Sequence, residues 1–319
     1  MPHAEDNPAD APLVSVVIPS HNCERYIAET IGSVLGQTHR DVEVLVVDDG
    51  STDRTREIAG AFGSPVRLIE QDNAGVCVAR NRGAREARGR FVCFMDHDDY
   101  WFPDKLARQV DAMRRHPECG VVFAGFILWN PLENGEYPAP AGFDLSGYPC
   151  GDDAEFSGWI YHKFLLDCWM LTSTAMFRRE VFRECGLFDE SLPYSEDWDL
   201  WLRIARVFPF VKLGRPNTLY RQHPGQGNRV VRPVDYRTRL LVQAVKRWGY
   251  ASPDGRAVSR GEFRKKLAEY HAHYGLHQIA NGRRARGIGA LARACATEPF
   301  RLRYLACVMA ALLGWKPKH

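Results

Sequence analysis

Residues 42–62, VEVLVVDDGSTDRTREIAGAF, contain the structural unit that decides the fold. The first six residues are mostly apolar and β-branched, which is typical of a buried strand, and the polar DDGS turn ends that strand. The residues from Ser51 or Asp53 onward predict a helix. A strand that passes through a short turn into a helix is half of a βαβ unit, and such units build sheets of mainly parallel strands.

The same alternation continues on both sides of this segment. Apolar runs typical of strands alternate with stretches that carry apolar residues at helical spacing. The predicted strands are residues 13–20 (LVSVVIPS), 66–71 (VRLIEQ) and 90–95 (RFVCFM), and the predicted helices are residues 23–37 (CERYIAETIGSVLGQ) and 75–87 (GVCVARNRGAREA). We therefore predict an α/β fold with a mainly parallel central sheet flanked by helices. Such sheets bind ligands beyond the carboxyl ends of their strands.

Carboxylates cluster at these strand ends. In residues 91–106, FVCFMDHDDYWFPDKL, an apolar strand runs directly into Asp96, Asp98 and Asp99. Close-set carboxylates repel one another unless a cation or a proton is present, and Mg²⁺ and Mn²⁺ bind through one or two carboxylates and substrate phosphates. A capped turn explains only one of the three, so we interpret the cluster as a metal–phosphate site. The Asp48–Asp49 pair is equally explained by a turn with a helix cap or by contact with a nucleotide.

Two later segments add candidates for chemistry. Residues 195–208, SEDWDLWLRIARVF, predict a helix with acids in its first turn, an arrangement that the helix dipole favours by itself. Beside a metal–nucleotide site, however, Asp197 would be positioned to act as a general base. In residues 219–228, LYRQHPGQGN, His223 is either a solvated loop residue or a further metal ligand. Arg221, like Arg80, faces either phosphates or a surface ion pair.

The charge distribution separates the chain into two parts. From Val231 onward the sequence contains 18 lysines and arginines against 5 acidic residues, whereas the preceding part is acidic. A basic end of this kind often faces an anionic surface. The last twenty residues, FRLRYLACVMAALLGWKPKH, combine apolar residues with flanking Arg and Lys. We expect them either to lie on an anionic bilayer or to cover the core as a packed helix.

Several classes of protein are disfavoured. The nine cysteines are irregularly spaced and include no CxxC pair, which indicates reduced thiols in the cytosol and not disulfides or a zinc site. The chain has no GxxxxGK[ST] loop, and the fingerprint of a dinucleotide-binding dehydrogenase does not follow its first strand. No aromatic-rich basic sheet suggests specific RNA binding, so we expect no nucleic-acid partner. No apolar run reaches the roughly 18–20 residues that a membrane span requires.

Five segments, taken in order, resemble a known family. They are VSVVIPSHNCERYIAETIGSVLGQT, VEVLVVDDGSTDRT, DNAGVCVARNRG, FMDHDDYWFPDKL and SEDWDLWLRIA, and the resemblance extends from Val14 to His223. The chain resembles the inverting glycosyltransferases of family 2, which include many enzymes of bacterial polysaccharide and cell-envelope assembly. The resemblance implies the GT-A (nucleotide-diphospho-sugar transferase) fold. It also implies a hexosyl- or related transferase that moves a sugar to a hydroxyl acceptor with inversion.

The resemblance implies roles for individual residues. Asp197 matches the catalytic base, with Glu196 beside it in the ED pair. Asp98 would hold Mn²⁺ or Mg²⁺, with Asp96 and His223 as further metal ligands and with Asp96 also near the ribose. The nucleotide-sugar contacts fall on Pro19, Ser20, Asn22, Glu24, Asp48, Asp49, Arg80 and Asp96. His21 stands where the family motif usually has tyrosine, which is expected to alter stacking but not the chemistry.

The expected partners follow from the same resemblance. UDP is the expected carrier of the donor sugar, with GDP and dTDP as alternatives, and the expected acceptor is a carbohydrate or a lipid-linked glycan intermediate. We expect a cytoplasmic protein with peripheral contact at the inner face of the cell membrane. A sugar-nucleotide pyrophosphorylase is the alternative enzyme, but residues 19–26, PSHNCERY, lack its glycine- and Arg/Lys-rich loop. A non-catalytic nucleotide-sugar-binding protein is the other alternative, and the intact ED pair disfavours it.

The predicted domain organisation has three parts. Residues 1–12 form a flexible polar tail, residues 13–228 the GT-A glycosyltransferase domain, and residues 229–319 a basic helical C-terminal extension. Within the transferase domain, residues 13–124 form the nucleotide-binding half and residues 125–228 the acceptor and catalytic half. Residues 125–157 are rich in Pro, Gly and aromatics, which predicts a loop that faces the substrate.

Overall fold

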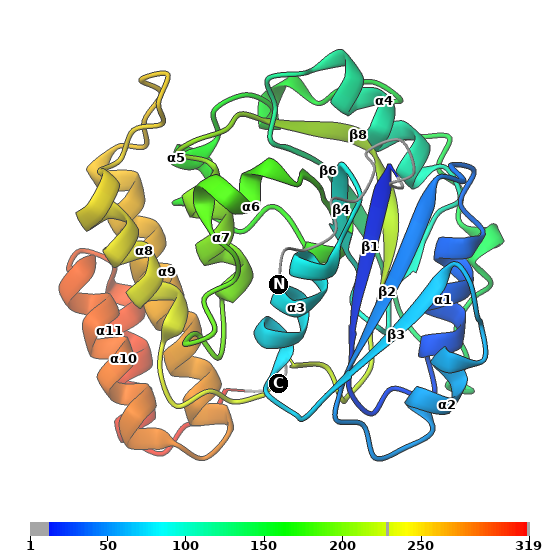
Figure 1. Ribbon diagram of the computed structural model, residues 1–319. Helices are drawn as coiled ribbons and strands as arrows, with labels where there is room; N and C mark the ends of the chain where they lie inside the picture. Colours follow the sequence, from blue (N-terminus) through cyan, green and yellow to red (C-terminus); the bar gives the residue numbers. More distant parts are fainter. Residues whose placement is uncertain (1–12, 228–229, 318–319) are drawn as a thin grey trace. The chain divides into compact units, whose positions relative to one another are not determined.

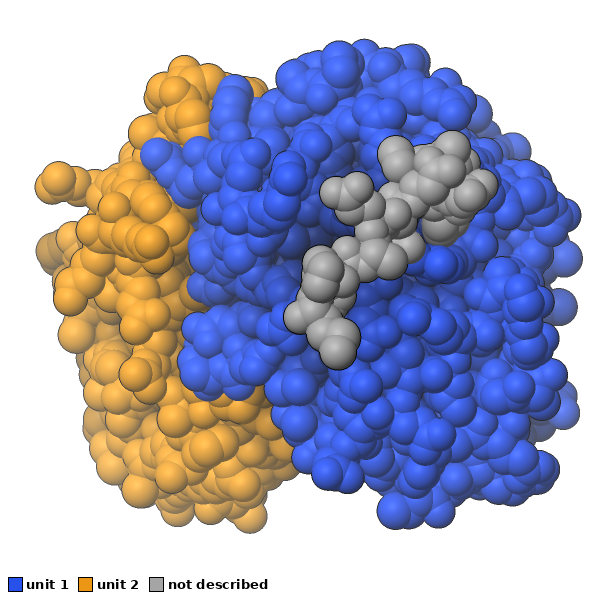
Figure 2. Space-filling view, in the orientation of Figure 1, with its two compact units in different colours: residues 1–160, 168–192, 196–223 blue, residues 161–167, 193–195, 224–319 orange. Residues whose placement is uncertain are grey.

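The computed structural model describes residues 13–227 and 230–317, so the predicted tail at residues 1–12 and the predicted domain boundary at residues 228–229 lie outside the described part. The chain divides into two units, which are coloured separately in Figure 2. The first unit takes the residues up to Ile160 together with residues 168–192 and 196–223. The second unit takes residues 161–167, residues 193–195 and those from Pro224 onward. Residues 161–167, 193–195 and 224–227 of the predicted acceptor half therefore belong to the C-terminal unit.

Eight strands form a mixed sheet in the first unit (Figure 1). Their order across the sheet is β3-β2-β1-β4-β7-β6-β8-β5. Strands β1 to β4 run parallel to one another, as do β6 and β8, whereas β7 runs antiparallel to β4 and β6, and β5 runs antiparallel to β8. The strands are β1 Val14–Ser20, β2 Val42–Asp49, β3 Val66–Gln71, β4 Phe91–Phe94, β5 Tyr100–Trp101, β6 Val121–Trp129, β7 Met176–Arg178 and β8 Phe210–Arg221.

Helices cover both faces of this sheet. Alternate residues of a strand point to opposite faces, so Val16 of β1 packs in a core with α1, α2 and α4, whereas Val17 faces α3. Helices α6 and α7 also cover the second face, since Phe94 contacts the ring of Phe182 in α6 and Phe177 of β7 stacks on Trp201 of α7. The α-helices of the first unit are α1 Ile27–Leu35, α2 Thr55–Gly60, α3 Val76–Glu86, α4 Lys105–Arg115, α6 Glu180–Cys185 and α7 Glu196–Ile204.

Helix α3 lies close to β1 at Gly83. A Cβ atom at this position would be 2.3 Å from Cγ1 of Val17, closer than nonbonded carbon atoms approach one another. Only glycine therefore permits this contact between helix and strand. The contact matters for the site because it fixes the position of Arg80, about one helical turn earlier in α3.

The predicted elements are present, with differences at their ends. The strand at residues 66–71 has the predicted bounds, and the helix predicted at residues 195–208 is shorter, Glu196–Ile204. The loop predicted at residues 125–157 begins inside β6, which continues to Trp129. Gly125 interrupts the apolar run there because it lies at an irregularity in the pairing of β6 with β8. An isolated glycine within a strand often marks such a bulge.

The described part of the second unit is helical. Helix α9 begins with a capping box in which Ser259 and Glu262 bond each other's backbone N–H groups. Helices α9 and α10 approach closely, and a Cβ atom at Gly275 would be 2.8 Å from the carbonyl oxygen of Gly287. No helix within residues 13–227 and 230–317 is both long and apolar enough to span a membrane. The α-helices are α5 Tyr161–Phe164, α8 Tyr236–Trp248, α9 Arg260–Ala280, α10 Arg284–Thr297 and α11 Leu302–Leu312.

Candidate active site

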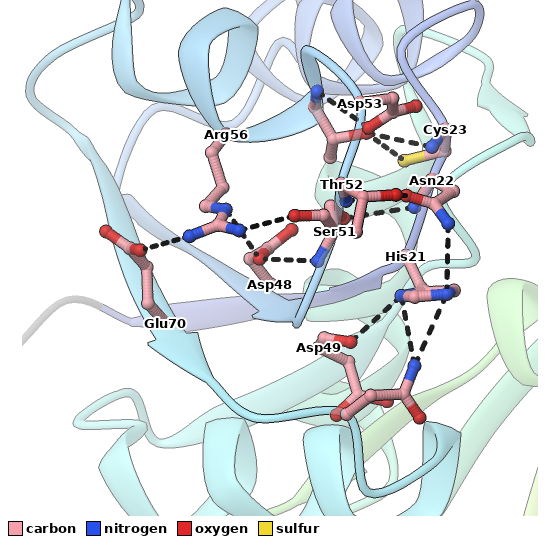
Figure 3. A network of polar contacts seen from close by, with 12 residues as sticks. His21, Asn22, Cys23, Asp48, Asp49, Ser51, Thr52, Asp53, Arg56 and Glu70 are labelled. Atoms are coloured by element: carbon pink, nitrogen blue, oxygen red, sulfur yellow. Dashed lines mark hydrogen bonds and ion pairs between the residues drawn. The ribbon is translucent and has the colours of Figure 1, made fainter.

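The loops that follow β1 and β2 are joined by hydrogen bonds at the carboxyl edge of the sheet (Figure 3). The backbone N–H of Asn22 donates to Oγ of Ser51 at 3.0 Å, and the backbone N–H of Thr52 donates to Oδ1 of Asn22 at 2.8 Å. Asn22 has φ of 47°, a left-handed conformation that asparagine tolerates better than most residues. Glu24 accepts a hydrogen bond from the backbone N–H of Arg54 at 3.0 Å. Two of the predicted nucleotide contacts thus also hold the loops together.

Asp49 organises the entry to helix α3. Its carboxylate accepts hydrogen bonds from Nε2 of Gln71 at 2.8 Å, from the backbone N–H of Ala74 at 2.9 Å and from that of Gly75 at 2.8 Å. A carboxylate at this end of a helix also interacts favourably with the helix dipole. Both carboxylate oxygens of Asp49 therefore accept hydrogen bonds from groups of the protein.

Asp48, the residue before Asp49, is buried, with 1% of its surface exposed. Its Oδ2 accepts from the backbone N–H of Ser51 at 3.1 Å and forms an ion pair with Arg56 at 3.3 Å (Figure 3). Its Oδ1 has no hydrogen-bond partner among the described residues. Ser20, the last residue of β1, pairs with Asp48 in the sheet, so the predicted contacts of the first and second strands lie at one edge.

The loop after β4 brings Asp98 next to His223. Nε2 of His223 lies 2.8 Å from Oδ2 of Asp98, and the imidazole ring also lies against Tyr26, with 4.9 Å between ring centroids. Burial would raise the pKa of Asp98, but the hydrogen bond to His223 and the charge of His97 outweigh it, and the pKa is lowered. Asp98 is thus held as a carboxylate at the end of the strand, as a metal ligand requires.

Asp99 differs from its neighbour. It is 1% exposed, its Oδ1 accepts from the backbone N–H of Arg221 at 3.2 Å, and its Oδ2 lacks a hydrogen-bond partner in the described part of the chain. Burial, followed by the charges of Asp98 and Asp96, raises its pKa well above the usual range. The three carboxyl groups therefore need not all be charged together, because Asp99 takes up a proton readily.

Arg221 supports this loop from a buried position that the sequence did not reveal. Its Nε donates to the backbone carbonyl of Asp98 at 2.6 Å, and it forms an ion pair with Glu29 at 2.6 Å. The guanidinium lies 4.0 Å from the ring centroid of Trp129 and 4.5 Å from that of Tyr137. Such cation–π contacts are strong when the cation is desolvated. Sequence analysis assigned Arg221 to phosphates or a surface pair, because nothing in the local sequence links it to rings from distant segments.

Arg80 connects the loop after β4 to helix α7. One terminal nitrogen of its guanidinium pairs with Asp96 at 2.7 Å and the other with Glu196 at 2.9 Å. The side chain is about 6% exposed, and the two carboxylates raise the pKa of Arg80 although burial acts against them. Asp96 and Glu196 are 100 residues apart in the sequence, so this guanidinium brings two predicted parts of the site together.

Asp197 follows at the start of α7. Its Oδ1 accepts a hydrogen bond from the backbone N–H of Trp198 at 2.7 Å. Burial raises the pKa of Asp197 to about 7, with a further contribution from the neighbouring Glu196 carboxylate and an opposing one from Arg80. A carboxylate with a pKa close to neutral is suited to accept a proton during a reaction.

The pair formed by Asp98 and His223 has donor atoms suited to a divalent cation. Mn²⁺ and Mg²⁺ accept one or two protein ligands of this kind when phosphate oxygens and water complete the coordination. Within residues 13–227 and 230–317, no three His, Cys, Asp or Glu side chains are grouped so that they could hold a metal. Asp96, predicted as a further ligand, forms an ion pair with Arg80 at 2.7 Å. Its role as a metal ligand stays a prediction.

Family models and curated relatives match the chain. The model described as Glycosyl transferase family 2 matches residues 15–186, and one described as Glycosyltransferase like family 2 matches residues 146–247. An uncharacterised glycosyltransferase of Rickettsia typhi is 31% identical over 62% of this chain and 60% of its own length. The putative teichuronic acid biosynthesis glycosyltransferase TuaG of Bacillus subtilis is 42% identical over 37% of this chain and 48% of its own length. The chain thus spans about 60% of the first of these relatives.

Solved structures show the same fold. S. aureus TarS, residues 1–349 in complex with UDP-GlcNAc, superimposes with a TM-score of 0.63 at 19% identity, covering 93% of this chain and 84% of that one. The mannosyltransferase PcManGT from Pyrobaculum calidifontis, in complex with GDP-Man and Mn²⁺, gives a TM-score of 0.56 at 23% identity, covering 98% of this chain and 83% of that one. The predicted GT-A fold with its C-terminal helices is confirmed.

Proposed function

The chain belongs to glycosyl transferase family 2, and from this premise we propose that it transfers a sugar from a nucleotide diphosphate to an acceptor hydroxyl with inversion at the anomeric carbon. We further propose Asp197 as the general base and Asp98 as the principal metal ligand. The observation that carries the proposal is the double ion pair of Arg80. Through it, the acids after β4 and the acids of α7 lie in one site, and neither group alone would suffice for the transfer.

In the proposed reaction, the acceptor oxygen attacks C1 of the sugar from the face opposite the diphosphate. The bond from that oxygen to C1 forms while the bond from C1 to the diphosphate oxygen breaks, and the leaving diphosphate keeps the electron pair. Asp197 takes the proton of the attacking hydroxyl. A single displacement inverts the configuration at C1, so an α-linked donor gives a β-linked product.

Asp98 and His223 would hold the divalent cation, Mn²⁺ or Mg²⁺. When bound, such an ion neutralises the charge that develops on the leaving diphosphate. Arg80 forms ion pairs with Asp96 and Glu196 and so keeps these two acids in place, with Glu196 next to Asp197 in the sequence. PcManGT, which has the same fold, was solved in complex with Mn²⁺, and this supports a divalent cation here.

The nucleotide and the acceptor are inferred from the related proteins. TarS and PcManGT bind UDP-GlcNAc and GDP-Man, which supports a nucleotide-sugar donor, and UDP is our preferred carrier. The similarity to a putative teichuronic acid enzyme supports a carbohydrate or lipid-linked acceptor in cell-envelope polysaccharide assembly. The predicted nucleotide contacts at Pro19, Ser20, Asn22, Glu24, Asp48 and Asp49 all lie at the carboxyl ends of β1 and β2, where such a donor would bind.

Helix α11 supports a peripheral contact with an anionic membrane, at the inner face of the cell membrane as proposed from the sequence. It exposes Leu302, Leu305, Met309 and Leu312, and Leu313 follows directly; Leu302 and Leu313 are 74% and 86% exposed. Cations flank these apolar residues at both ends of the helix, and the described chain has no acidic residue after Glu298. An exposed apolar helix flanked by cations is typical of segments that lie in a bilayer interface. The basic residues concerned are Arg301, Arg303 and Lys316.

A thermal-shift panel tests the proposed donor site. The protein would be heated with UDP-, GDP- and dTDP-sugars, each in the presence of Mn²⁺, Mg²⁺ or EDTA. We expect one nucleotide class to raise the melting temperature, and we expect EDTA to remove the effect, since ligands that bind only the folded state stabilise it. No metal-dependent response to any of these donors would contradict the proposed site.

A further inference from the structure

The second unit contains a cavity of about 550 Å³ whose lining includes no residue of the proposed donor site. Its walls come from α8 and α10, with side chains of α9 and of the segment before α8 completing it. On α8 the lining positions 238, 239, 242, 243 and 246 recur at helical spacing, so they share one face of that helix. The cavity is large enough for a small organic ligand.

Four cations line this cavity. Arg239 and Lys246 come from α8, and Arg286 and Arg293, seven residues apart on one face, come from α10. Within residues 13–227 and 230–317, none of the four side chains has a hydrogen bond or an ion pair. All four residues are exposed, so water screens part of their mutual repulsion, and a bound anion would relieve the rest.

The acid in the lining does not neutralise these cations. Asp235 caps helix α8 by accepting from the backbone N–H of Thr238 at 3.2 Å. Its other oxygen lies 3.1 Å from Nδ1 of His271. Both carboxylate oxygens are hydrogen-bonded, and the single negative charge of Asp235 against four cations leaves an excess of three positive charges in the lining.

The cavity also has an apolar side. Val234, Val242 and the ring of Tyr274 contribute to the lining, and Val242 is 39% exposed. The hydroxyl of Tyr274 donates to the backbone carbonyl of Pro233 at 2.9 Å, which fixes the ring against the segment before α8. Cations beside a fixed aromatic and aliphatic surface suit an anion that carries an organic group more than a bare inorganic ion.

From these features we propose that this cavity, a groove between α8 and α10, binds a phosphate ester. The phosphate or diphosphate would lie among Arg239, Lys246, Arg286 and Arg293. Arginine forks bind phosphate through paired hydrogen bonds, and lysine adds a point charge. One part of this proposal rests on the proposed function, namely that the groove binds the acceptor of the transfer reaction. The acceptor is then a phosphorylated glycan or a lipid-linked phosphate. Binding of the anion itself does not depend on that reaction.

Calorimetric titration of the full chain with inorganic pyrophosphate in EDTA tests the proposal. The groove variant R286Q/R293Q is expected to weaken binding at least about tenfold, which is roughly the contribution of one charge-assisted hydrogen bond to a charged group. The matched control R247Q/K265Q removes the same charge from exposed positions of α8 and α9 that do not line the cavity. It is expected to bind as the parent does.

Two results would overturn the proposal. Equal loss in the groove and control variants would mean that only net charge attracts pyrophosphate, and loss in Asp98→Asn with none in R286Q/R293Q would assign the binding to the donor site. Failure of the donor site itself appears separately, as absence of a metal-dependent response to nucleotide sugars with pyrophosphate binding intact.

Vesicles distinguish a lipid source from a soluble one. Phosphatidylcholine vesicles that contain phosphatidic acid present a phosphate monoester, and vesicles with phosphatidylserine present negative charge without one. Stronger binding to phosphatidic acid that R286Q/R293Q abolishes would support a lipid phosphate, and groove-dependent binding of pyrophosphate alone would support a soluble phosphate ester. If neither probe depends on the groove residues, the proposal is wrong.

Discussion

At the scale of single residues, the site is organised by pairs of opposite charge. Arg80 pairs with both Asp96 and Glu196, and Asp98 lies beside His223, so each of these three acids has a partner. Among the described residues, the carboxylate of Asp197 accepts a hydrogen bond from the backbone N–H of Trp198, and burial together with the Glu196 carboxylate raises its pKa to about 7. Of the two acids that begin α7, Glu196 is paired with Arg80, and Asp197 is the one proposed to take the proton.

Replacing Asp197 by asparagine should separate catalysis from binding. The amide keeps the shape of the side chain but cannot accept the acceptor's proton, so we expect transfer to fall by about 10²–10⁴-fold while donor affinity is unchanged. Product formation and calorimetric donor binding would be measured on the same preparation. Asp199→Asn, in the same helical turn but paired with Arg203, is the control and should retain transfer. Substantial residual transfer by Asp197→Asn would remove this residue from the base role.

The raised pKa of Asp197 also predicts the pH dependence of the reaction. A general base must be deprotonated, and burial raises the pKa of Asp197 to about 7, so the active form declines as the pH falls below that value. We expect kcat/KM to decrease about tenfold for each pH unit on the acid side of about pH 7. A rate profile between about pH 5 and about pH 8 measures this. A flat profile would show that Asp197 is ionised throughout or is not the base.

Replacing Asp98 by asparagine should affect the metal-dependent part of donor binding. The substitution removes the charged oxygen that faces His223 at 2.8 Å, so we expect donor affinity in Mn²⁺ to fall at least about tenfold. In EDTA, parent and variant should bind the donor equally weakly. Calorimetry in both buffers gives the comparison, and unchanged affinity in Mn²⁺ would argue against Asp98 as a ligand.

At the scale of secondary structure, the contact between α3 and β1 should tolerate no side chain at Gly83. An added Cβ would lie 2.3 Å from Cγ1 of Val17, and overpacking of this kind typically costs about 1–3 kcal/mol. Urea denaturation of Gly83→Ala would measure the loss in the free energy of unfolding. Gly32→Ala is the control, because a Cβ at this position of α1 meets nothing within 4 Å and alanine favours the helix. Equal stability of the two variants would contradict the close contact.

The elements near the nucleotide edge could be predicted because their sequence signals are local. Apolar strands that end in carboxylates place Asp48, Asp49 and Asp96 at one edge by topology alone. The surroundings of Arg221 could not be predicted in this way, since Trp129 and Tyr137 reach it from another segment. The extension of β6 beyond Gly125 was missed for a different reason, because a bulge glycine resembles the start of a loop.

At the scale of the whole molecule, the first unit contains the proposed donor residues and the second contains the cation-lined groove and α11. The excess of positive charge in the second unit was evident from composition, but composition could not show that four exposed cations gather around one groove. That arrangement depends on which helix faces meet. It required the three-dimensional structure.

Membrane contact is a property of the whole chain and is tested with intact protein. Sedimentation with anionic liposomes should recover the parent protein, whereas Leu302→Gln combined with Leu313→Gln should reduce binding at least about tenfold, because each side chain contributes roughly 1.5–3 kcal/mol on burial in an apolar phase. Both residues are highly exposed, so the substitutions leave the folded core unchanged. Leu128→Gln combined with Leu132→Gln, about half exposed in the first unit, is the control. Failure of the parent to sediment would exclude this contact.

The buried cage around Arg221 gives the protein an internal optical reporter. The indole of Trp129 lies 4.0 Å from the guanidinium, which in turn bonds the backbone carbonyl of Asp98 at 2.6 Å. Indole emission shifts with the position of a nearby charge, so any movement of the Asp98 loop alters the fluorescence of this tryptophan. The difference spectrum between the parent and Trp129→Phe isolates that signal from the other tryptophans. Movement of the Asp98 loop when a ligand binds can thus be followed in real time without an attached label.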